Sequence, residues 1–522
     1  MHPPEAAVNQ SSGASPYPHD FARRTPWLTL VLLLAASAVV RFLYLTRKPF
    51  WFDESFSAEV ARISWGNFLH LLWWREANMS LYYLLLRMWL QFGHSEFYIR
   101  SLSVVVAVAT IPAIYWLARL LFDRRVALIA AALFTFNAYS VRYAQEARSY
   151  GLFLLLATLS SAFLITLVRE PVRRNRVGYV LVSILAVYAH FYALLLLAAH
   201  WLALRWLGSG EGSTDGTKLS AQLRRAWITI GVAVLPLLVF VTKTGAGPIR
   251  WIQRPGFHDL LEFFEHLAGA NSWPLLALSA VACIMTVAPL GRKLWARGQT
   301  WEVWRCQFLL LWLLFPVGLT VLLSFARPVF LARYMIFCLP ALLILVAAGL
   351  SRLRQSWLLT VALTGILLLS MQGVLFVYAN DFDSERDASS AAAGFILDHA
   401  QPGDAIVFHI AATRIPYEFV RSQRSGEDTA SPRFIIQLGP EILFPYHGAG
   451  LDYRDFTGKP TADLLRAAAP NRPRMRVMLM NNGPAGDPDP TTVMLTNVLP
   501  ESFPKVQRWQ FAKVEVRLYT KE

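Results

Sequence analysis

Long apolar segments, separated by short polar and basic connections, occupy most of the first three quarters of the chain. Their length and continuity favour spanning α-helices over the alternating strands of an outer-membrane barrel. The segments begin near Trp27, Ser101, Val126, Gly151, Val177, His190, Ala226, Pro274, Gln307, Leu331 and Trp357. The pattern therefore predicts a mainly α-helical, polytopic bundle of about 11 spans, within a range of about 9 to 13.

Two apolar segments have lengths that do not fit a single ordinary span. The stretch from Val177 to Leu207 is too long for one ordinary span, and the basic clusters at both of its ends favour a hairpin that turns near His190. The stretch from Leu81 to Phe92 is short and carries Arg87 in its middle. We expect it to be an interfacial helix on the outer surface.

Basic residues gather in every second connection. The clusters are Arg23 and Arg24; Arg124 and Arg125; Arg169, Arg173, Arg174 and Arg176; Arg224 and Arg225; Arg292, Lys293 and Arg297; and Arg352 and Arg354. Because positive residues favour the cytoplasmic side, these connections are predicted to be cytoplasmic. Residues 1–26 are then a disordered cytoplasmic tail before a retained anchor, and the first external loop covers residues 46–98 within a membrane domain of residues 27–378.

The composition changes after Tyr378, where polar and acidic residues become ordinary in frequency. We predict a small external α/β domain over residues 379–522. Its expected helices are Ser384 to His399 and Ala462 to Ala468, and its expected strands are Ala405 to Ile410, Phe434 to Leu438, Met475 to Met480 and Val514 to Tyr519.

Composition supports an integral membrane protein. Of the 522 residues, 55% are hydrophobic and only 16% are charged, and the mean hydropathy is +0.40. A net charge of +15 follows from the basic connections, so nucleic acid is not an expected partner. Cys283, Cys306 and Cys338 lack the paired spacing of a metal site or disulfide framework and are interpreted as packing residues.

Two adjacent carboxylates, Asp53 and Glu54, stand in an aromatic stretch of the first external loop. A structural interpretation makes Asp53 the cap of a helix from Glu54 to about Ile63. A functional interpretation makes the pair a general base or a cation ligand that faces a membrane-bound substrate. The two interpretations are compatible, because a capping position fixes a carboxylate well.

A second constellation lies in the polar break that contains Glu146, Arg148 and Tyr150, and a third contains Arg333 and Tyr334. The planar guanidinium suits a lipid phosphate, and the tyrosines add hydroxyl groups. The plainer alternatives are a Glu146–Arg148 or interfacial charge pair, and snorkelling of Arg333 from a helix end.

Weaker candidates complete the set. Lys243 lies in the long external loop, and His190 is either a proton carrier or a satisfied interfacial histidine. Charged groups gather on one face, and few lie at mid-membrane, which favours surface chemistry over transport.

The order of these elements resembles a known family, the GT-C glycosyltransferases that take sugars from polyprenyl-phosphate carriers. The similarity extends to protein mannosyltransferases, lipid A aminoarabinose transferases and rhizobial lipopolysaccharide core transferases. It is carried by Phe52 to Ser55, Leu81 to Arg87 (with Tyr82), Ser95 to Ser101, Tyr143 to Tyr150, Tyr188 to Tyr192, and Arg333 and Tyr334 with Pro340. One departure is Asn78-Met79-Ser80, where relatives carry a His-Pro-Pro or Lys-Pro-Pro element.

The resemblance implies that Asp53 is the catalytic carboxylate with Glu54 beside it, and that Arg148 and Arg333 hold the donor phosphate. It implies a donor sugar on polyprenyl phosphate and an envelope glycolipid, glycan or protein as acceptor, at the outer face of the cytoplasmic membrane. A divalent cation such as Mg²⁺ or Mn²⁺ between the Asp53–Glu54 pair and the phosphate stays open, because the arginines alone are sufficient.

The expected function is therefore sugar transfer with inversion at the anomeric carbon, in lipopolysaccharide biosynthesis or protein glycosylation. The main alternative is a transporter or flippase of lipid-linked sugars, which also needs arginines for a lipid phosphate. A ligase of whole lipid-linked glycans and a non-catalytic scaffold are the remaining alternatives.

Overall fold

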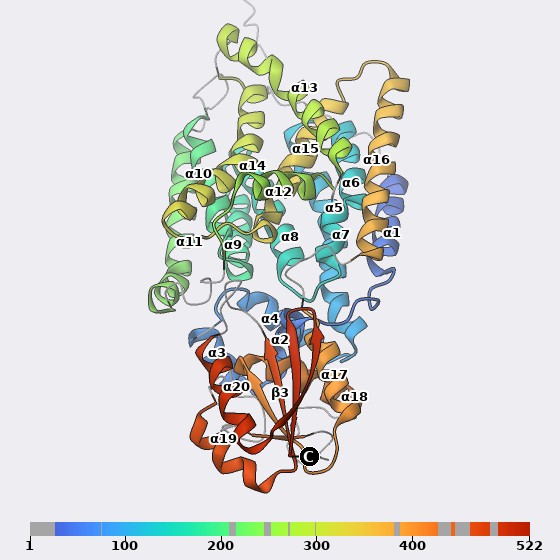
Figure 1. Cartoon of the computed structure of the whole chain (residues 1–522). Helices are drawn as coiled ribbons and strands as arrows, with labels where there is room; N and C mark the ends of the chain where they lie inside the picture. Colours follow the sequence, from blue (N-terminus) through green and yellow to red (C-terminus); the bar gives the residue numbers. More distant parts are fainter. Residues whose placement is uncertain are drawn as a thin grey trace, which may run out of the picture.

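A bundle of apolar helices stands above a small mixed sheet, and three short helices lie between them (Figure 1). The computed structural model describes residues 27–74, 76–207, 216–244, 252–269, 272–297, 299–380, 387–425, 440–443, 460–480 and 489–521. The predicted disordered tail of residues 1–26 lies outside this described part.

The bundle consists mainly of helices that begin close to the predicted starts. Its first half comprises α1 (Trp27–Phe42), α5 (Glu96–Leu121), α6 (Arg124–Phe136), α7 (Ala138–Ala144), α8 (Tyr150–Arg169), α9 (Arg173–Ala189) and α10 (Ala193–Arg205). Its second half comprises α11 (Gly216–Thr244), α12 (Phe257–Gly269), α13 (Trp273–Arg297), α14 (Trp301–Ala326), η2 (Ala332–Cys338), α15 (Leu339–Leu350) and α16 (Ser356–Ala379). The predicted hairpin is present, since α9 and α10 meet at a turn that begins with His190.

The predicted number of spans is not confirmed. Within the described ranges, seven helices are long and apolar enough to cross a membrane, or eight if α6 and α7, which bend by 58° at their junction, form one span. Helices α1 and α10, with 16 and 13 residues, are apolar but shorter. Length and composition therefore support a multi-pass bundle with fewer full-length spans than expected.

Several of the basic connections lie together at the end of the bundle away from the sheet. Arg169 donates to the carbonyl oxygen of Leu120, and Arg305 donates to that of Leu121 at 2.9 Å. These bonds join segments that are far apart in the sequence, at the ends of α5, α8 and α14.

Helix α12 was not expected, because the stretch between Lys243 and Trp273 was interpreted as an external loop. The helix is amphipathic: Phe263 and Leu267 are fully buried, whereas Phe257 is exposed. Its apolar face packs on the bundle, which explains why it forms in a segment too short to span.

Three short helices line the sheet-side end of the bundle: α2 (Phe52–Arg62), α3 (Trp65–Trp74) and α4 (Ser80–Trp89). Helix α4 coincides with the segment that was predicted to form a short helix. The guanidinium carbon of Arg87 lies 4.1 Å from the centre of the Trp65 ring, which places this charge over an aromatic face.

The predicted cap of α2 is wrong. Trp51 occupies the N-cap position without a side-chain hydrogen bond, and Asp53 lies in the first turn. The capping acceptor comes from the C-terminal part of the chain, where the Asp387 carboxylate accepts from the backbone N–H of Phe52 at 3.2 Å. This long-range cap fixes the direction in which α2 begins.

The C-terminal sheet has the strand order β2-β1-β3-β5-β4. Its strands are β1 (Ala405–His409), β2 (Glu441–Ile442), β3 (Arg474–Met480), β4 (Lys505–Phe511) and β5 (Val514–Thr520). Strands β1, β2 and β3 are parallel, whereas β5 pairs antiparallel with β3 and β4. The strands predicted at 405–410, 475–480 and 514–519 are present, β4 was missed, and the strand predicted at Phe434 to Leu438 lies outside the described residues.

Helices cover both faces of this sheet (Figure 1). They are α17 (Ser389–His399), α18 (Arg414–Ser425), α19 (Ala462–Ala468) and α20 (Pro490–Ser502), of which α18 and α20 were not predicted. Alternate side chains of β1 enter different cores: Ile406 packs with α17 and α18, and Val407 packs with α19 and α20. The period of two along each strand therefore builds a three-layer α/β unit.

Helix α18 docks the sheet unit onto α2. The rings of Phe50 and Phe419 stack with centres 4.9 Å apart, and Arg62 donates to the Ser422 hydroxyl at 3.2 Å. The segment that contains Phe50 and α2 is consequently held against the sheet unit.

Gly349 provides a test of bundle packing. A Cβ atom added there would lie 1.9 Å from the carbonyl oxygen of Ala282 in α13, so Gly349→Ala forces α13 and α15 apart. We expect a loss of about 1–3 kcal/mol of stability, read as a lower melting temperature in detergent. The matched control is Gly318→Ala in α14, where nothing lies within 4 Å and the change gains up to about 1 kcal/mol. Equal shifts in the two variants would contradict this packing.

Candidate active site

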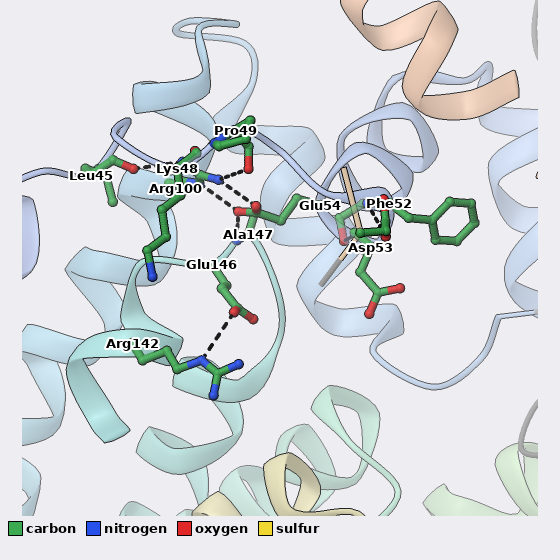
Figure 2. A network of polar contacts seen from close by, with 12 residues as sticks. Leu45, Lys48, Pro49, Phe52, Asp53, Glu54, Arg100, Arg142, Glu146 and Ala147 are labelled. Carbon is green, nitrogen blue, oxygen red and sulfur yellow. Dashed lines mark hydrogen bonds and ion pairs between the residues drawn. The ribbon is translucent and has the colours of Figure 1, made fainter. Parts of the chain in front are cut away.

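The adjacent carboxylates of Asp53 and Glu54 point in different directions (Figure 2). Glu54 is fully buried and forms a bidentate pair with Arg100, with Nε–Oε1 and Nη2–Oε2 distances of 2.7 and 2.6 Å. The backbone N–H of Ala147 also donates to Oε1 of Glu54 at 3.0 Å. Both carboxylate oxygens of Glu54 therefore accept hydrogen bonds from other groups of the protein.

Arg100 also forms hydrogen bonds with the turn that precedes α2. It donates to the carbonyl oxygens of Leu45 and Lys48, both at 2.8 Å (Figure 2). Its guanidinium lies over the Phe50 ring. The pair with Glu54 thus connects the first loop, α5 and the turn before α8. This geometry suits a positioning role for Glu54 rather than the catalytic role that we predicted beside Asp53.

Asp53 lies at the centre of the candidate site. Its Oδ2 atom is 3.4 Å from Nη2 of Arg148 and 4.0 Å from Nη2 of Arg333. The Asp53 side chain is 22% exposed, whereas both arginine side chains are nearly buried. Three elements distant in the sequence, α2, the turn before α8, and η2, therefore place one accessible carboxylate between two cationic groups.

Secondary contacts hold Arg148 in place. Its Nη1 atom lies 3.5 Å from the carbonyl oxygen of Asp53 and 3.4 Å from the hydroxyl of Ser57. The Ser57 hydroxyl in turn donates to the Asp53 carbonyl at 2.9 Å. The guanidinium is thus oriented by the same first turn of α2 that carries the carboxylate.

Several aromatic rings pack against one another beside the two arginines. The Tyr334 ring lies 4.8 Å from the His190 ring and 6.4 Å from the Tyr150 ring, and the His190 ring stacks on Phe153 at 5.1 Å. The hydroxyl of Tyr150 is buried, and it has no partner among the described residues. The predicted phosphate-site tyrosines therefore lie beside the arginines, and Tyr150 has a polar atom available for a ligand.

His190 is a neutral group in this site. Its Nδ1 atom accepts from the backbone N–H of Tyr192 at 3.2 Å, and its buried Nε2 atom has no partner within the described ranges. Burial, aided by the charges of Arg148 and Arg333, lowers the pKa of His190 to about 3. The imidazole is then a donor through Nε2 rather than a proton carrier at neutral pH.

The remaining candidates lie outside this cluster. Tyr82 shares a hydrogen bond of 2.9 Å with Ser103, and Lys243 lies over the rings of Trp73 and Trp74 on α3. Glu146 is 4.0 Å from Arg142, so the predicted Glu146–Arg148 pair gives way to the pair of Arg148 with Asp53.

Glu146 and Arg142 line a pocket together with Arg100 and Tyr378. Among the described residues, neither Tyr82, Lys243 nor the side chains that line this pocket form a hydrogen bond or ion pair with Asp53.

Sequence reasoning missed two side chains near Asp53. Tyr83 is fully buried, and its hydroxyl has no partner in the described part of the chain, so Tyr83 rather than its neighbour Tyr82 offers a free polar atom. Burial raises the pKa of Glu76, between α3 and α4, to about 7, with smaller effects of the charge of Arg148, which lowers it, and of Asp53, which raises it. The available signal was a lone acidic residue just before the unusual Asn78-Met79-Ser80 element.

The donor set does not suit a divalent cation. Glu54 is saturated by Arg100 and Ala147, and Asp53 faces two guanidinium groups, which repel a second positive charge. Among the described residues, no group of three His, Cys, Asp or Glu side chains is placed to hold a metal ion. The arginines are the cations that this arrangement supplies.

Solved structures resemble the whole chain. ArnT from Cupriavidus metallidurans bound to undecaprenyl phosphate superposes with a TM-score of 0.58 at 13% identity, covering 95% of this chain and 98% of that one. Its apo state gives a TM-score of 0.57 at 12% identity over the same shares.

The archaeal oligosaccharyltransferase AglB from Archaeoglobus fulgidus, in complex with an inhibitory peptide and a dolichol-phosphate, is also similar. Its TM-score is 0.50 at 11% identity, over 86% of this chain and 69% of that one. No family model and no curated protein matches the sequence. The chain has the GT-C fold, as its motifs indicated.

The Glu54–Arg100 pair generates a prediction about stability. Glu54→Ala leaves a buried guanidinium without its partner, and we expect a loss of about 3–5 kcal/mol, measured as a lower melting temperature in detergent. The control is Asp398→Ala, which breaks a solvent-exposed pair with Arg424 and should leave the melting temperature almost unchanged. An unchanged melting temperature for Glu54→Ala, with activity lost, would return Glu54 to a catalytic role.

Proposed function

We propose that this chain is a membrane glycosyltransferase that moves a sugar from a polyprenyl-phosphate donor to a hydroxyl group of a cell-envelope acceptor. The observation that carries the proposal is the convergence of Arg148 and Arg333 on Asp53 at the mouth of an apolar bundle. The proposed location is the outer face of the cytoplasmic membrane, with the sheet unit outside.

The two arginines suit the departing phosphate. When the bond between the anomeric carbon and the phosphate oxygen breaks, negative charge grows on the phosphate. Donors already aimed at that charge lower the barrier, and guanidinium groups bind phosphate oxygens in a planar, bidentate manner. Arg148 and Arg333 are nearly buried, so their attraction for the phosphate is weakly screened. The hydroxyl of Tyr150 and Nε2 of His190 offer further donors nearby.

Asp53 provides the acceptor side of the reaction. Its carboxylate is partly exposed and accepts a hydrogen bond from the attacking hydroxyl, which orients that oxygen toward the anomeric carbon. Attack from the side opposite the phosphate inverts the anomeric configuration. The product's anomeric configuration tests this step, and retention would contradict a single displacement.

The solved structures with the same fold give support on the donor side. The ArnT structure contains undecaprenyl phosphate, and the AglB structure contains a dolichol-phosphate. A lipid-linked donor is compatible with a site at the end of helices long and apolar enough to cross a membrane. The acceptor is proposed only as an envelope glycolipid, glycan or protein, because acceptor pockets vary within one fold.

Asp53→Asn tests the proposed activity. Membranes that contain the protein are incubated with a panel of radiolabelled polyprenyl-phosphate sugars, and transfer to membrane acceptors is measured. We expect the variant to lose at least about 100-fold in rate, because it loses the carboxylate that orients the hydroxyl. Asp398→Asn, on an exposed surface, is the matched control. Translocation of the carrier without transfer would favour the flippase alternative.

The arginines generate a separate prediction. Arg148→Gln or Arg333→Gln removes a charge-assisted contact with the donor phosphate, and we expect the KM for the donor to rise about 10-fold or more. The measurement is the donor dependence of initial rates in both variants. Unchanged donor KM values in both variants would contradict phosphate binding at this site.

A further inference from the structure

A pocket opens on the flank of the bundle where α1 and α16 end. About 390 Å³ of empty space, its opening included, lies between the turn after α1, the end of α7 and the last turn of α16. The Tyr378 hydroxyl donates to the carbonyl oxygen of Val40, which joins the two helices on this side of the bundle (Figure 1). Within the described ranges, neither Arg148 nor Arg333 lines this pocket, so it is separate from the candidate active site.

The pocket lies at the level where a span ends. Helix α16 is long and apolar enough to cross a membrane, and it ends at Ala379, directly after the lining residues Val377 and Tyr378. The rings of Tyr44 and Tyr378 meet edge to face, with centres 5.3 Å apart. Tyrosine is typical of the membrane–water interface, because its ring is apolar and its hydroxyl is polar. The pocket is therefore level with lipid headgroups.

The surface beside the pocket is apolar and exposed. On α1, Val39 and Leu43 are 63% and 46% exposed, and on α16 Leu375 is 57% exposed. In a spanning bundle, such side chains face the acyl chains of the bilayer. A molecule with a polar head and apolar chains therefore fits the pocket and its surroundings together.

The lining of the pocket is cationic. Arg100 contributes little to this charge, because Glu54 neutralises it at 2.6 Å. The other charged groups of the lining are three cations and one carboxylate, namely Arg47, Lys48, Arg142 and Glu146. Glu146 lies 4.0 Å from Arg142, so an excess of positive charge is left at the turn after α1. The pocket thus favours an anion.

Arg47 has guanidinium donors available for that anion. It is exposed, its guanidinium carbon lies 5.5 Å from the centre of the Tyr44 ring, and its side chain has no hydrogen bond or ion pair with another described residue. The turn that carries it is nevertheless fixed. The backbone N–H of Arg47 donates to the carbonyl oxygen of Tyr44 at 3.1 Å, and Arg100 binds the carbonyl oxygens of Leu45 and Lys48.

From these observations we infer that the pocket binds the phosphate group of an anionic membrane lipid, at a site distinct from the proposed donor site. Guanidinium groups bind phosphate oxygens through parallel N–H donors, and basic pockets between spanning helices bind lipid headgroups. Arg47 holds the phosphate at the rim and Arg142 holds it from inside, while the acyl chains lie along α1 and α16. No step of the proposed transfer reaction depends on this lipid.

The test measures lipid binding to the full chain by native mass spectrometry from detergent. Phosphatidylglycerol, which is anionic, is compared with phosphatidylethanolamine, which has no net charge, at the same acyl chains. We expect the first phosphatidylglycerol to bind at least about 10-fold more tightly, and Arg47→Gln and Arg142→Gln each to weaken its binding about 5-fold. The matched control is Arg205→Gln, because Arg205 is also exposed and lies over an aromatic ring, that of Trp201, outside the pocket.

The variants separate a built site from interfacial anchoring. Weaker binding in the two pocket variants, with native binding in Arg205→Gln, supports the inference. Equal affinity for the two lipids, or the same loss in Arg205→Gln, would mean that these arginines only anchor the protein at the interface, and would overturn it. Because Arg47 is exposed, its variant decides the test even where Arg142→Gln destabilises the protein.

Two further arms identify the site and the source of the phosphate. If Arg148→Gln abolishes binding of phosphatidylglycerol and Arg47→Gln does not, the lipid occupies the candidate active site and the inference fails. Millimolar inorganic phosphate is added as a competitor: retention of the lipid supports a membrane lipid as the ligand, whereas its displacement would assign the pocket to a soluble phosphate. Sugar transfer does not enter the measurement, so failure of the proposed function and failure of this inference are distinguishable.

Discussion

The buried ion pair between Glu54 and Arg100 is the interaction on which the candidate active site depends. A buried pair is costly to desolvate, and here its remaining polar atoms are used by backbone groups of the first loop and of the turn before α8. The Ala147 N–H that binds Glu54 immediately precedes Arg148. One buried carboxylate therefore fixes the position of the guanidinium that its neighbour Asp53 faces, because residues 53 and 54 point to different sides of α2.

The sheet unit completes the same platform from the other side. Asp387 caps the first turn of α2, and it also accepts from the backbone N–H of Ser389 at the start of α17. One carboxylate thus joins the beginning of two helices that are more than 300 residues apart. Stacking of Phe50 on Phe419 supports the same contact. The C-terminal part of the chain therefore helps to position Asp53.

Sequence patterns predicted most elements and the main cluster of residue types. Apolar runs marked where the helices begin. Asp53, Arg148 and Arg333 were identified because ionisable residues at the ends of apolar helices are energetically costly and therefore mark candidate functional sites. Patterns could not assign partners: that Glu54 binds Arg100, or that Asp387 caps α2, depends on contacts between distant segments. The choice between Tyr82 and Tyr83 depended on the rotation of α4. Helix lengths were also undetermined from the sequence, so the predicted number of spans is not confirmed.

The charges of the proposed reaction explain why one carboxylate and two arginines gather in a partly buried site. A sugar phosphodiester brings one negative charge, and after transfer the polyprenyl phosphate monoester approaches two. Arg148 and Arg333 together carry one positive charge more than Asp53 neutralises, so the departing phosphate gains its charge beside groups that are already positive. In a low-dielectric site this arrangement lowers the cost of the new charge, because solvation by water is restricted there.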